Sequence, residues 1–255
     1  YITKPVSKEK LVQTINKALR KKMNLNNKTF IITGGSSGIG KAIAQKLVGK
    51  GASVLITGRD ESKLKAVGDE LRCEYVKADI GTPEGVKLTI TTAINKLGKL
   101  DGLINNAGHG WMNKMHEYSW QDFEETYRVN VFGAAMMGQA AAKVFMEQKS
   151  GNIVNIASTA ATKGFAGGSV YSSSKFALRG LTQCWQAELR PFNVRVLGVN
   201  PSEVTTAFAQ ADRKERSDTE NKLRAEEIAH AIISALEMDD RGYIPELSVH
   251  ATNPF

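Results

Sequence analysis

The feature that most constrains the fold is a regular alternation, from residue 29 onward, of short apolar segments with longer segments of helical pattern. Candidate strands lie at 30–33, 54–57, 75–78, 103–105, 153–156, 194–197 and 242–244, and candidate helices at 38–50, 61–72, 83–97, 119–148 and 170–190. Several candidate strands are apolar at successive positions, which is typical of strands buried on both faces of a parallel sheet. The pattern predicts one doubly wound α/β domain over residues 23–255, with helices on each face of the sheet.

The first 22 residues follow a different pattern. Residues 1–5 form a candidate strand that ends in Lys4-Pro5, and Ser7 could cap a helix with one apolar stripe. This segment resembles the last strand and helix of a response-regulator receiver domain. An amphipathic extension that docks on the body or on a neighbouring subunit explains it equally well, and both interpretations stay open.

Composition excludes several classes of protein. The chain is 42% hydrophobic and 24% charged, and no stretch approaches the roughly twenty apolar residues of a membrane span. Two cysteines, Cys73 and Cys184, give neither a disulfide framework nor a metal-ligand spacing. The net charge is +8, but residues 1–28 hold eight basic side chains and one acidic one, so the remainder carries only +1. We therefore expect a cytoplasmic protein without metal, membrane or nucleic-acid partners.

A glycine-rich segment joins the first candidate strand to the first candidate helix. Its sequence, residues 33–40, is TGGSSGIG. Glycine permits positive φ and close approach of the backbone to a pyrophosphate, while the helix N-terminus supplies free N–H groups and positive partial charge. A glycine-rich turn alone is weak evidence, but between a strand and a helix it predicts a dinucleotide site.

Arg59 follows the second candidate strand, which in this architecture ends at the adenosine ribose. An acid there would bind the free 2′-hydroxyl of NAD, whereas Arg59 can pair with the 2′-phosphate of NADP. Ser36 and Ser37 are possible further donors to this phosphate. The sequence therefore favours NADP(H), with a solvated surface arginine as the alternative.

A tyrosine and a lysine stand four residues apart in a candidate helix, as Tyr171 and Lys175. At this spacing both lie on one face of a helix, where the ammonium can stabilise the phenolate and lower the pKa of the tyrosine. The pair alone could be an exposed helix face. Ser158 ends another strand at the edge where such sheets bind ligands, and Asn130 lies within the helix of 119–148.

Together these motifs resemble those of classical short-chain dehydrogenases/reductases, in the same order along about 175 residues. The resemblance implies a three-layer αβα Rossmann fold, Tyr171 as general acid/base, Lys175 lowering its pKa and binding the nicotinamide ribose, Ser158 polarising the carbonyl, and Asn130 holding a water of the proton relay. It assigns cofactor contacts to Gly34, Ser36, Ser37, Gly38, Ile39, Gly40, Arg59, Asp79, Ile80, Asn106, Ala107, Gly108, Tyr171, Lys175, Pro201, Val204 and Thr206, with Asp79 at the adenine amino group.

One position departs from the family pattern. Where the turn after the sixth strand usually has glycine following its proline, this chain has Ser202. If the turn needs glycine's positive φ, serine there would be strained.

These observations predict an NADPH-dependent oxidoreductase that reduces a carbonyl group reversibly. Gly110, Trp111, Met112 and Phe165 are candidates for an apolar pocket that takes a modest ketone, an aldehyde or a 3-oxoacyl thioester, and the short polar loop at 207–223 offers no large apolar lid. A regulatory NADP-binding module with little turnover is the alternative. The resemblance also implies a homodimer or homotetramer, formed through the two long helices.

Overall fold

The computed structural model describes residue 7 and residues 24–206, 208 and 219–254. The predictions for residues 1–22, and most of the loop at 207–223, lie outside the described residues. Among those described, no helix is both long enough and apolar enough to cross a bilayer.

Seven parallel strands form one sheet in the order β3-β2-β1-β4-β5-β6-β7. The strands are β1 (Thr29–Thr33), β2 (Ser53–Gly58), β3 (Glu74–Lys77), β4 (Gly102–Asn105), β5 (Gly151–Ile156), β6 (Val194–Pro201) and β7 (Glu246–Val249). The order reverses between β1 and β4, so a crevice opens outside the carboxyl ends of these two strands. This is the predicted doubly wound Rossmann-type fold in a single domain.

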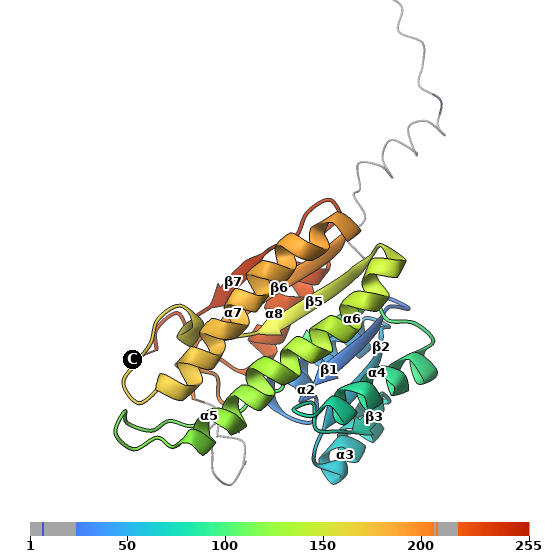
Figure 1. Cartoon of the computed structure of the whole chain (residues 1–255). Coiled ribbons are helices and arrows are strands. Elements are labelled where there is room, and N and C mark those ends of the chain that lie inside the picture. Colours follow the sequence, from blue (N-terminus) through green and yellow to red (C-terminus); the bar gives the residue numbers. More distant parts are fainter. Residues whose placement is uncertain (1–6, 8–23, 207, 209–218, 255) are drawn as a thin grey trace, which may run out of the picture.

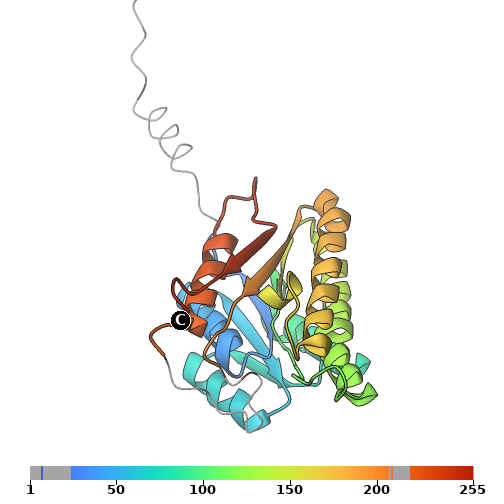
Figure 2. The same cartoon turned by 90° about the vertical axis from the view of Figure 1, so that its left-hand side faces the viewer.

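Helices cover both faces of the sheet (Figures 1 and 2). They are α2 (Gly38–Gly49), α3 (Glu61–Leu71), α4 (Pro83–Leu97), α5 (Trp120–Tyr127), α6 (Ala134–Gln148), α7 (Ser169–Leu189) and α8 (Ala225–Leu236). α2 contacts α3 and α8 on one face, and α6 contacts α4 and α7 on the other. The result is the predicted three-layer arrangement.

Each buried strand supplies two hydrophobic cores. In β1, Ile32 packs into the core beneath α2 and α8, whereas Ile31 packs into the core beneath α4 and α6. Both side chains are fully buried. Because successive side chains of a strand point to opposite faces, an uninterrupted apolar run is the pattern that such a two-sided sheet requires.

The last strand differs from its prediction. The aromatic and aliphatic segment at 242–244 lies outside the sheet, and β7 begins at Glu246, after Pro245. The carbonyl of Pro245 accepts from the Gly198 N–H at 3.0 Å, which sets the register that pairs Gly198 with Glu246. The sequence of β7 contains the polar residues Glu246 and Ser248 and therefore lacks the apolar run of a buried strand. These residues are tolerated because β7 is at the edge of the sheet and is only partly buried.

The helix predicted at 119–148 is interrupted. A π-helical turn, Arg128–Gly133, separates α5 from α6. At Gly133 the helix presses against the backbone of the segment after β3, so that a Cβ there would lie 2.6 Å from the Ile80 carbonyl oxygen. The extra residue of the π turn places Asn130 inward, where it is only 1% exposed.

Candidate active site

The glycine-rich segment forms a tight loop between β1 and α2. Gly34 and Gly38 have φ of +66° and +50°, a conformation that side chains with a Cβ rarely adopt. A Cβ on Gly40 would lie 2.3 Å from the Gly34 carbonyl oxygen, so only glycine permits this closure. The first turn of α2 contains no acidic residue, and its N-cap Ser37 makes no capping bond. The N-terminus of α2 therefore presents a positive partial charge that favours a pyrophosphate.

The segment after β4 is fixed to this loop. The Asn106 side chain donates to the carbonyls of Thr33 and Gly34, both at 3.0 Å. The Thr33 hydroxyl accepts from the backbone N–H groups of Asn106 and Ala107, also at 3.0 Å. These four bonds tie the ends of β1 and β4 to each other at the cleft wall.

Arg59 lies exposed on the cleft wall, near Ser36 and Ser37 of the loop. Lys63, one turn along α3, lines the same part of the cleft. The sequence interpretation missed Lys63, although its i+4 spacing from Arg59 at the start of a helix could have revealed it. Two cations and two hydroxyl groups fit a phosphate ester on the adenosine side of a dinucleotide.

Asp79 also lines the cleft, with both carboxylate oxygens occupied. Oδ1 accepts from the Gly81 N–H and Oδ2 from Arg128, each at 2.9 Å. Burial alone would raise the pKa of Asp79, but the bonds from Arg128 and Gly81 and the charge of Arg59 hold this pKa below its ordinary value. Asp79 is therefore an anion, and its contact with adenine remains a prediction.

The side chains of Tyr171, Lys175 and Ser158 line the cleft together. Tyr171 and Lys175 lie one turn apart on α7 and are 9% and 4% exposed. The Lys175 Nζ lies 5.7 Å from the centroid of the Tyr171 ring and donates to the Ile156 carbonyl at 2.8 Å. Ser158 follows β5, and its Oγ accepts from the Ala160 N–H at 3.1 Å.

The expected acidification of Tyr171 is not found. Burial raises the pKa of Tyr171 to about 12, and a hydrogen bond with the Ser158 side chain offsets this only in part. Burial also lowers the pKa of Lys175 to about 8, because the low-dielectric surroundings disfavour the ammonium. Desolvation is the largest cause of both shifts, so the phenol keeps its proton at neutral pH.

Asn130 does not line the cleft. Its Oδ1 accepts from the His109 N–H at 2.8 Å, and its Nδ2 donates to the His109 carbonyl at 2.7 Å and to the Ser174 hydroxyl at 3.0 Å. The Asn130 side chain therefore links the backbone after β4 to α7 by hydrogen bonds. The predicted water contact of Asn130 remains a prediction.

The turn after β6 closes the opposite wall. Pro201, Val204 and Thr206 line the cleft, and Thr206 packs over the glycine-rich loop, where a Cβ on Gly38 would lie 3.2 Å from its Cγ2. Ser202 is not among the four non-glycine residues with positive φ in the described chain. The strain considered for serine at this position is therefore absent.

One cleft of about 1100 Å³ joins these parts. All predicted catalytic and cofactor-binding residues line it except Asn130 and Gly40, which support its walls from behind. The volume exceeds the usual 300–1,000 Å³ of small-molecule sites, as a dinucleotide with a substrate requires. No cluster of three or more His, Cys, Asp or Glu side chains suited to a metal ion occurs among the described residues.

The pocket beside Tyr171 differs in part from its prediction. Met112 and Phe165 line the cleft, whereas Gly110 and Trp111 do not, and the Trp111 ring N–H donates to Glu125 at 3.1 Å. Phe208 lies against Tyr171, with ring centroids 5.4 Å apart. Neither periodicity nor a motif marked Phe208, because it stands alone in a polar loop.

Comparisons with known proteins agree with this geometry. The family model described as short chain dehydrogenase matches residues 28–217. An uncharacterised oxidoreductase of Staphylococcus aureus (strain USA300) is 34% identical over 232 residues, which cover 88% of this chain and 97% of the relative. One from Staphylococcus epidermidis is 30% identical over 228 residues, with the same coverage. The matched region begins after residue 22, so it lends no support to the receiver-domain resemblance.

Solved structures share the whole fold. An alcohol dehydrogenase from the archaeon Thermococcus sibiricus, in complex with 5-hydroxy-NADP, superposes with a TM-score of 0.82 at 27% identity, over 88% of this chain and 97% of that one. A metagenomic short-chain oxidoreductase in complex with NADP gives 0.77 at 30% identity, over 90% and 99%. With a family model that matches most of its length and a site built from that family's motifs, the chain is an oxidoreductase of the short-chain dehydrogenase family.

Proposed function

We propose that the protein transfers hydride between NADP(H) and the carbonyl carbon of a ketone, an aldehyde or a 3-oxoacyl compound, reversibly. The observation that carries the proposal is that Tyr171, Ser158 and Lys175 share one cleft with the glycine-rich loop. One cleft then contains a proton donor, a hydroxyl for the carbonyl oxygen and a site for a dinucleotide pyrophosphate.

The proposed proton donor is the Tyr171 phenol. Its raised pKa, about 12, keeps it protonated at neutral pH, and an alkoxide is a strong enough base to accept that proton. The Ser158 hydroxyl, which faces Tyr171, would hold the carbonyl oxygen and stabilise its developing charge. When bound, the nicotinamide supplies the hydride. Met112, Phe165 and Phe208 would exclude water beside the reacting carbonyl.

The preference for NADP(H) rests on Arg59 and Lys63, which line the cleft where the second strand ends. The glycine-rich loop would hold the pyrophosphate through backbone N–H groups, and Lys175 would hold the nicotinamide ribose. The solved structures in complex with NADP or 5-hydroxy-NADP support this preference by analogy.

The test is a panel of ketones, aldehydes and 3-oxoacyl thioesters, with turnover followed by the loss of NADPH absorbance. The parent should oxidise NADPH with at least one of them. Tyr171→Phe should lose at least about 10³-fold in kcat, because the donor is gone, and should keep its affinity for NADPH. Parent-level turnover by this variant would refute the mechanism. Tight NADPH binding with no turnover on the whole panel would favour the regulatory module instead.

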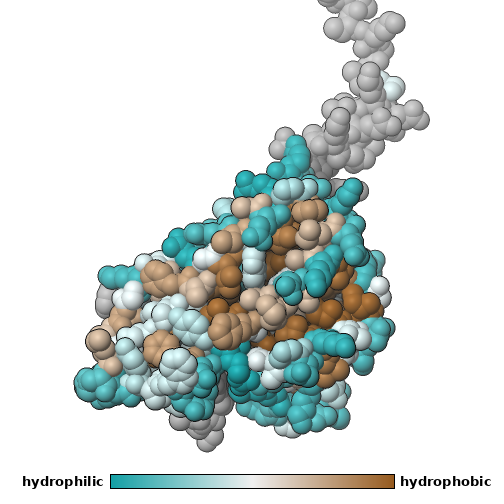
Figure 3. Space-filling model, viewed as in Figure 1, coloured by the Kyte–Doolittle hydropathy of each residue, from teal (hydrophilic) through white to brown (hydrophobic). Residues whose placement is uncertain are grey.

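We further propose that the chain forms a homodimer or a homotetramer through α6 and α7. Apolar side chains gather over these two helices on one face of the molecule (Figure 3). Met136 on α6 and Phe176 on α7 are 43% and 45% exposed, and Phe132, in the π turn before α6, is 59% exposed. An apolar surface on two adjacent helices is a common interface between subunits.

A further inference from the structure

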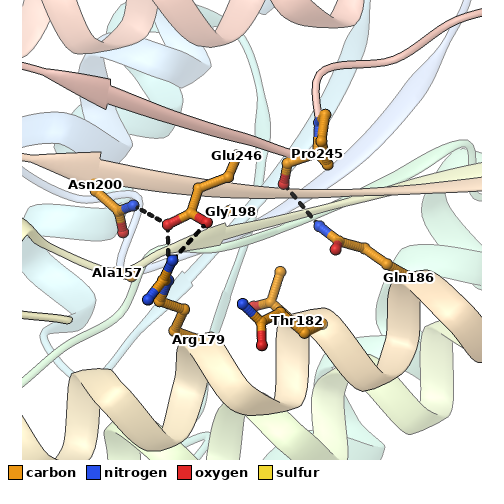
Figure 4. Close-up of a pocket in the computed structure, with 9 residues that line it drawn as sticks. Ala157, Arg179, Thr182, Gln186, Gly198, Asn200, Pro245 and Glu246 are labelled. Atoms are coloured by element: carbon orange, nitrogen blue, oxygen red, sulfur yellow. Dashed lines mark hydrogen bonds and ion pairs between the residues drawn. The ribbon is translucent and has the colours of Figure 1, made fainter. Parts of the chain in front are cut away.

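A second, much smaller cavity lies behind the cleft, between α7 and strands β6 and β7 (Figure 4). Glu246 lines this cavity, and its carboxylate lies between the side chains of Arg179 and Asn200. Arg179 binds this carboxylate with both sides of its guanidinium, Nε to Oε1 at 2.8 Å and Nη2 to Oε2 at 3.1 Å. The Asn200 side chain donates to the same Oε1 at 2.5 Å. One carboxylate therefore joins a helix to the end of a strand.

The residues around this cavity adjoin three segments of the active site. Arg179 lies on α7, one turn beyond Lys175 and two beyond Tyr171. Asn200 immediately precedes Pro201, and Ala157, which also lines the cavity, immediately precedes Ser158. Among the described residues that line the cavity, Glu246 is the only one that carries a carboxylate.

The cluster joins a partly exposed ion pair, whose Arg179 and Glu246 side chains are 35% and 32% exposed, to a buried amide. Asn200 is 1% exposed, and its Oδ1 has no hydrogen-bond partner among the described residues. The cavity has a volume of about 10 Å³, close to what one water molecule needs. A polar group with one unmet bond beside a water-sized space is typical of a network completed by an ordered water. The Arg179 bonds also keep the pKa of Glu246 below its ordinary value, so the carboxylate is charged.

We propose that Glu246 is a positioning residue, which holds α7 and the turn at Pro201 in the arrangement that brings Tyr171 and Ser158 to one substrate. The proposal rests on the proposed function only for its readout in turnover. Loss of the carboxylate would leave a guanidinium and a buried amide without their shared partner. The catalytic helix could then shift relative to β6 while the fold persists.

The main variant is Glu246→Ala, and Glu246→Gln is its conservative counterpart, which keeps an oxygen acceptor for Arg179 and Asn200. The matched control is Glu237→Ala. Glu237 accepts from Lys50 at 2.6 Å, at the end of α8, and lines neither cavity. Both alanine variants remove a partly buried carboxylate from an ion pair between elements, and only one of them is joined to the active-site segments.

In the full-length protein, Glu246→Ala should lower kcat by about tenfold or more at saturating NADPH and substrate, well below its melting temperature. Glu246→Gln should restore most of kcat, and Glu237→Ala should leave it within about twofold of the parent. Parent-level kcat in Glu246→Ala, or an equal loss in Glu237→Ala, would overturn the proposal and leave Glu246 a purely structural role. If Glu246→Ala does not fold, Asn200→Ala and Arg179→Met test the same two connections.

Amide hydrogen exchange of the ligand-free protein gives a second readout that needs no turnover. Glu246→Ala should accelerate exchange at 157–162 and at 198–206, and Glu237→Ala should not. Unchanged exchange at both segments in Glu246→Ala would overturn the proposal. A parent that turns over no carbonyl compound would instead contradict the proposed function. The difference in amide exchange between Glu246→Ala and the parent would still decide the role of Glu246.

Discussion

Lys175 is an amine buried within the cleft, and its burial affects stability as well as chemistry. Its pKa is lowered from 10.5 to about 8 in the folded protein. Below about pH 8 the amine is charged in both the folded and the unfolded chain, and the folded chain bears the desolvation cost. Between about pH 8 and 10.5 only the unfolded chain keeps the proton, so stability rises with pH across this window.

Lys175→Met should therefore stabilise the protein while it impairs turnover. The lowered pKa corresponds to about 3 kcal/mol, and the lost hydrogen bond to Ile156 offsets about 1 kcal/mol of it, which leaves a gain of about 2 kcal/mol at neutral pH. Urea unfolding of parent and variant should show the gain near pH 7 and its disappearance near pH 10. A gain that is the same at both pH values would show that protonation of the amine is not its cause.

Under the proposed function, the choice of dinucleotide depends on Arg59. Arg59→Asp should raise the Kd for NADPH by about 10- to 100-fold and change that for NADH little, because a charge-assisted bond to phosphate is lost and a repulsive charge is gained. Fluorescence titration with both dinucleotides measures this shift. Lys65→Asp is the control, because Lys65 lies exposed on α3, the helix that begins two residues after Arg59, and does not line the cleft. Unchanged selectivity in Arg59→Asp would remove Arg59 from this role.

At the scale of elements, the π turn between α5 and α6 supports the cleft through Asn130. Its amide both accepts from the backbone N–H of His109 and donates to the backbone carbonyl of His109, which a carboxylate of the same shape cannot do. Asn130→Asp replaces the donor with a second acceptor beside the His109 carbonyl. We expect a loss of stability of about 1–3 kcal/mol at neutral pH.

The loss should shrink as the pH falls, because a protonated carboxyl regains the donor. Burial raises the pKa of the introduced acid, so the destabilisation is present above this pKa and is relieved below it. Thermal unfolding of the parent and of Asn130→Asp between about pH 5 and pH 8 would reveal the trend. Asn130→Ala, which has no group to titrate, should show a constant difference, and a pH-dependent difference there would contradict this explanation.

Elements with local determinants were predictable from the sequence. α4 was predicted at 83–97 and spans those residues, because Thr82 caps it by accepting from the Gly85 N–H and Gly98 ends it at φ +76°. The π turn was not predictable, since it depends on the approach of the Ile80 backbone from another segment. β7 was missed for a similar reason: its polar side chain Glu246 is held by Arg179, a contact that periodicity does not encode.

In the candidate site too, the features fixed by local spacing were predictable and those that depend on tertiary contacts were not. The positions of Tyr171 and Lys175 on one face, and of Ser158 at the sheet edge, could be predicted from spacing. The pKa of Tyr171 could not, because it depends on how much surrounding structure excludes water. Phe208 joins the cleft through a tertiary contact with Tyr171 that no sequence pattern marks, so the sequence indicated the chemistry of the site better than its electrostatics.

At the scale of the whole molecule, the exposed apolar face of α6 and α7 is where assembly is expected. Phe176 lies on α7 and is 45% exposed, and Phe132 lies in the π turn that contacts α7 and is 59% exposed. Phe176→Glu should shift a dimer or tetramer toward smaller species, because an unpaired charge would be buried in the interface. Sedimentation velocity at several protein concentrations measures the change. Met238→Glu, at an exposed apolar residue after α8, should leave the parent's assembly intact. A parent that sediments as a monomer throughout would exclude assembly through this face, and the exposed phenylalanines would then need a different explanation.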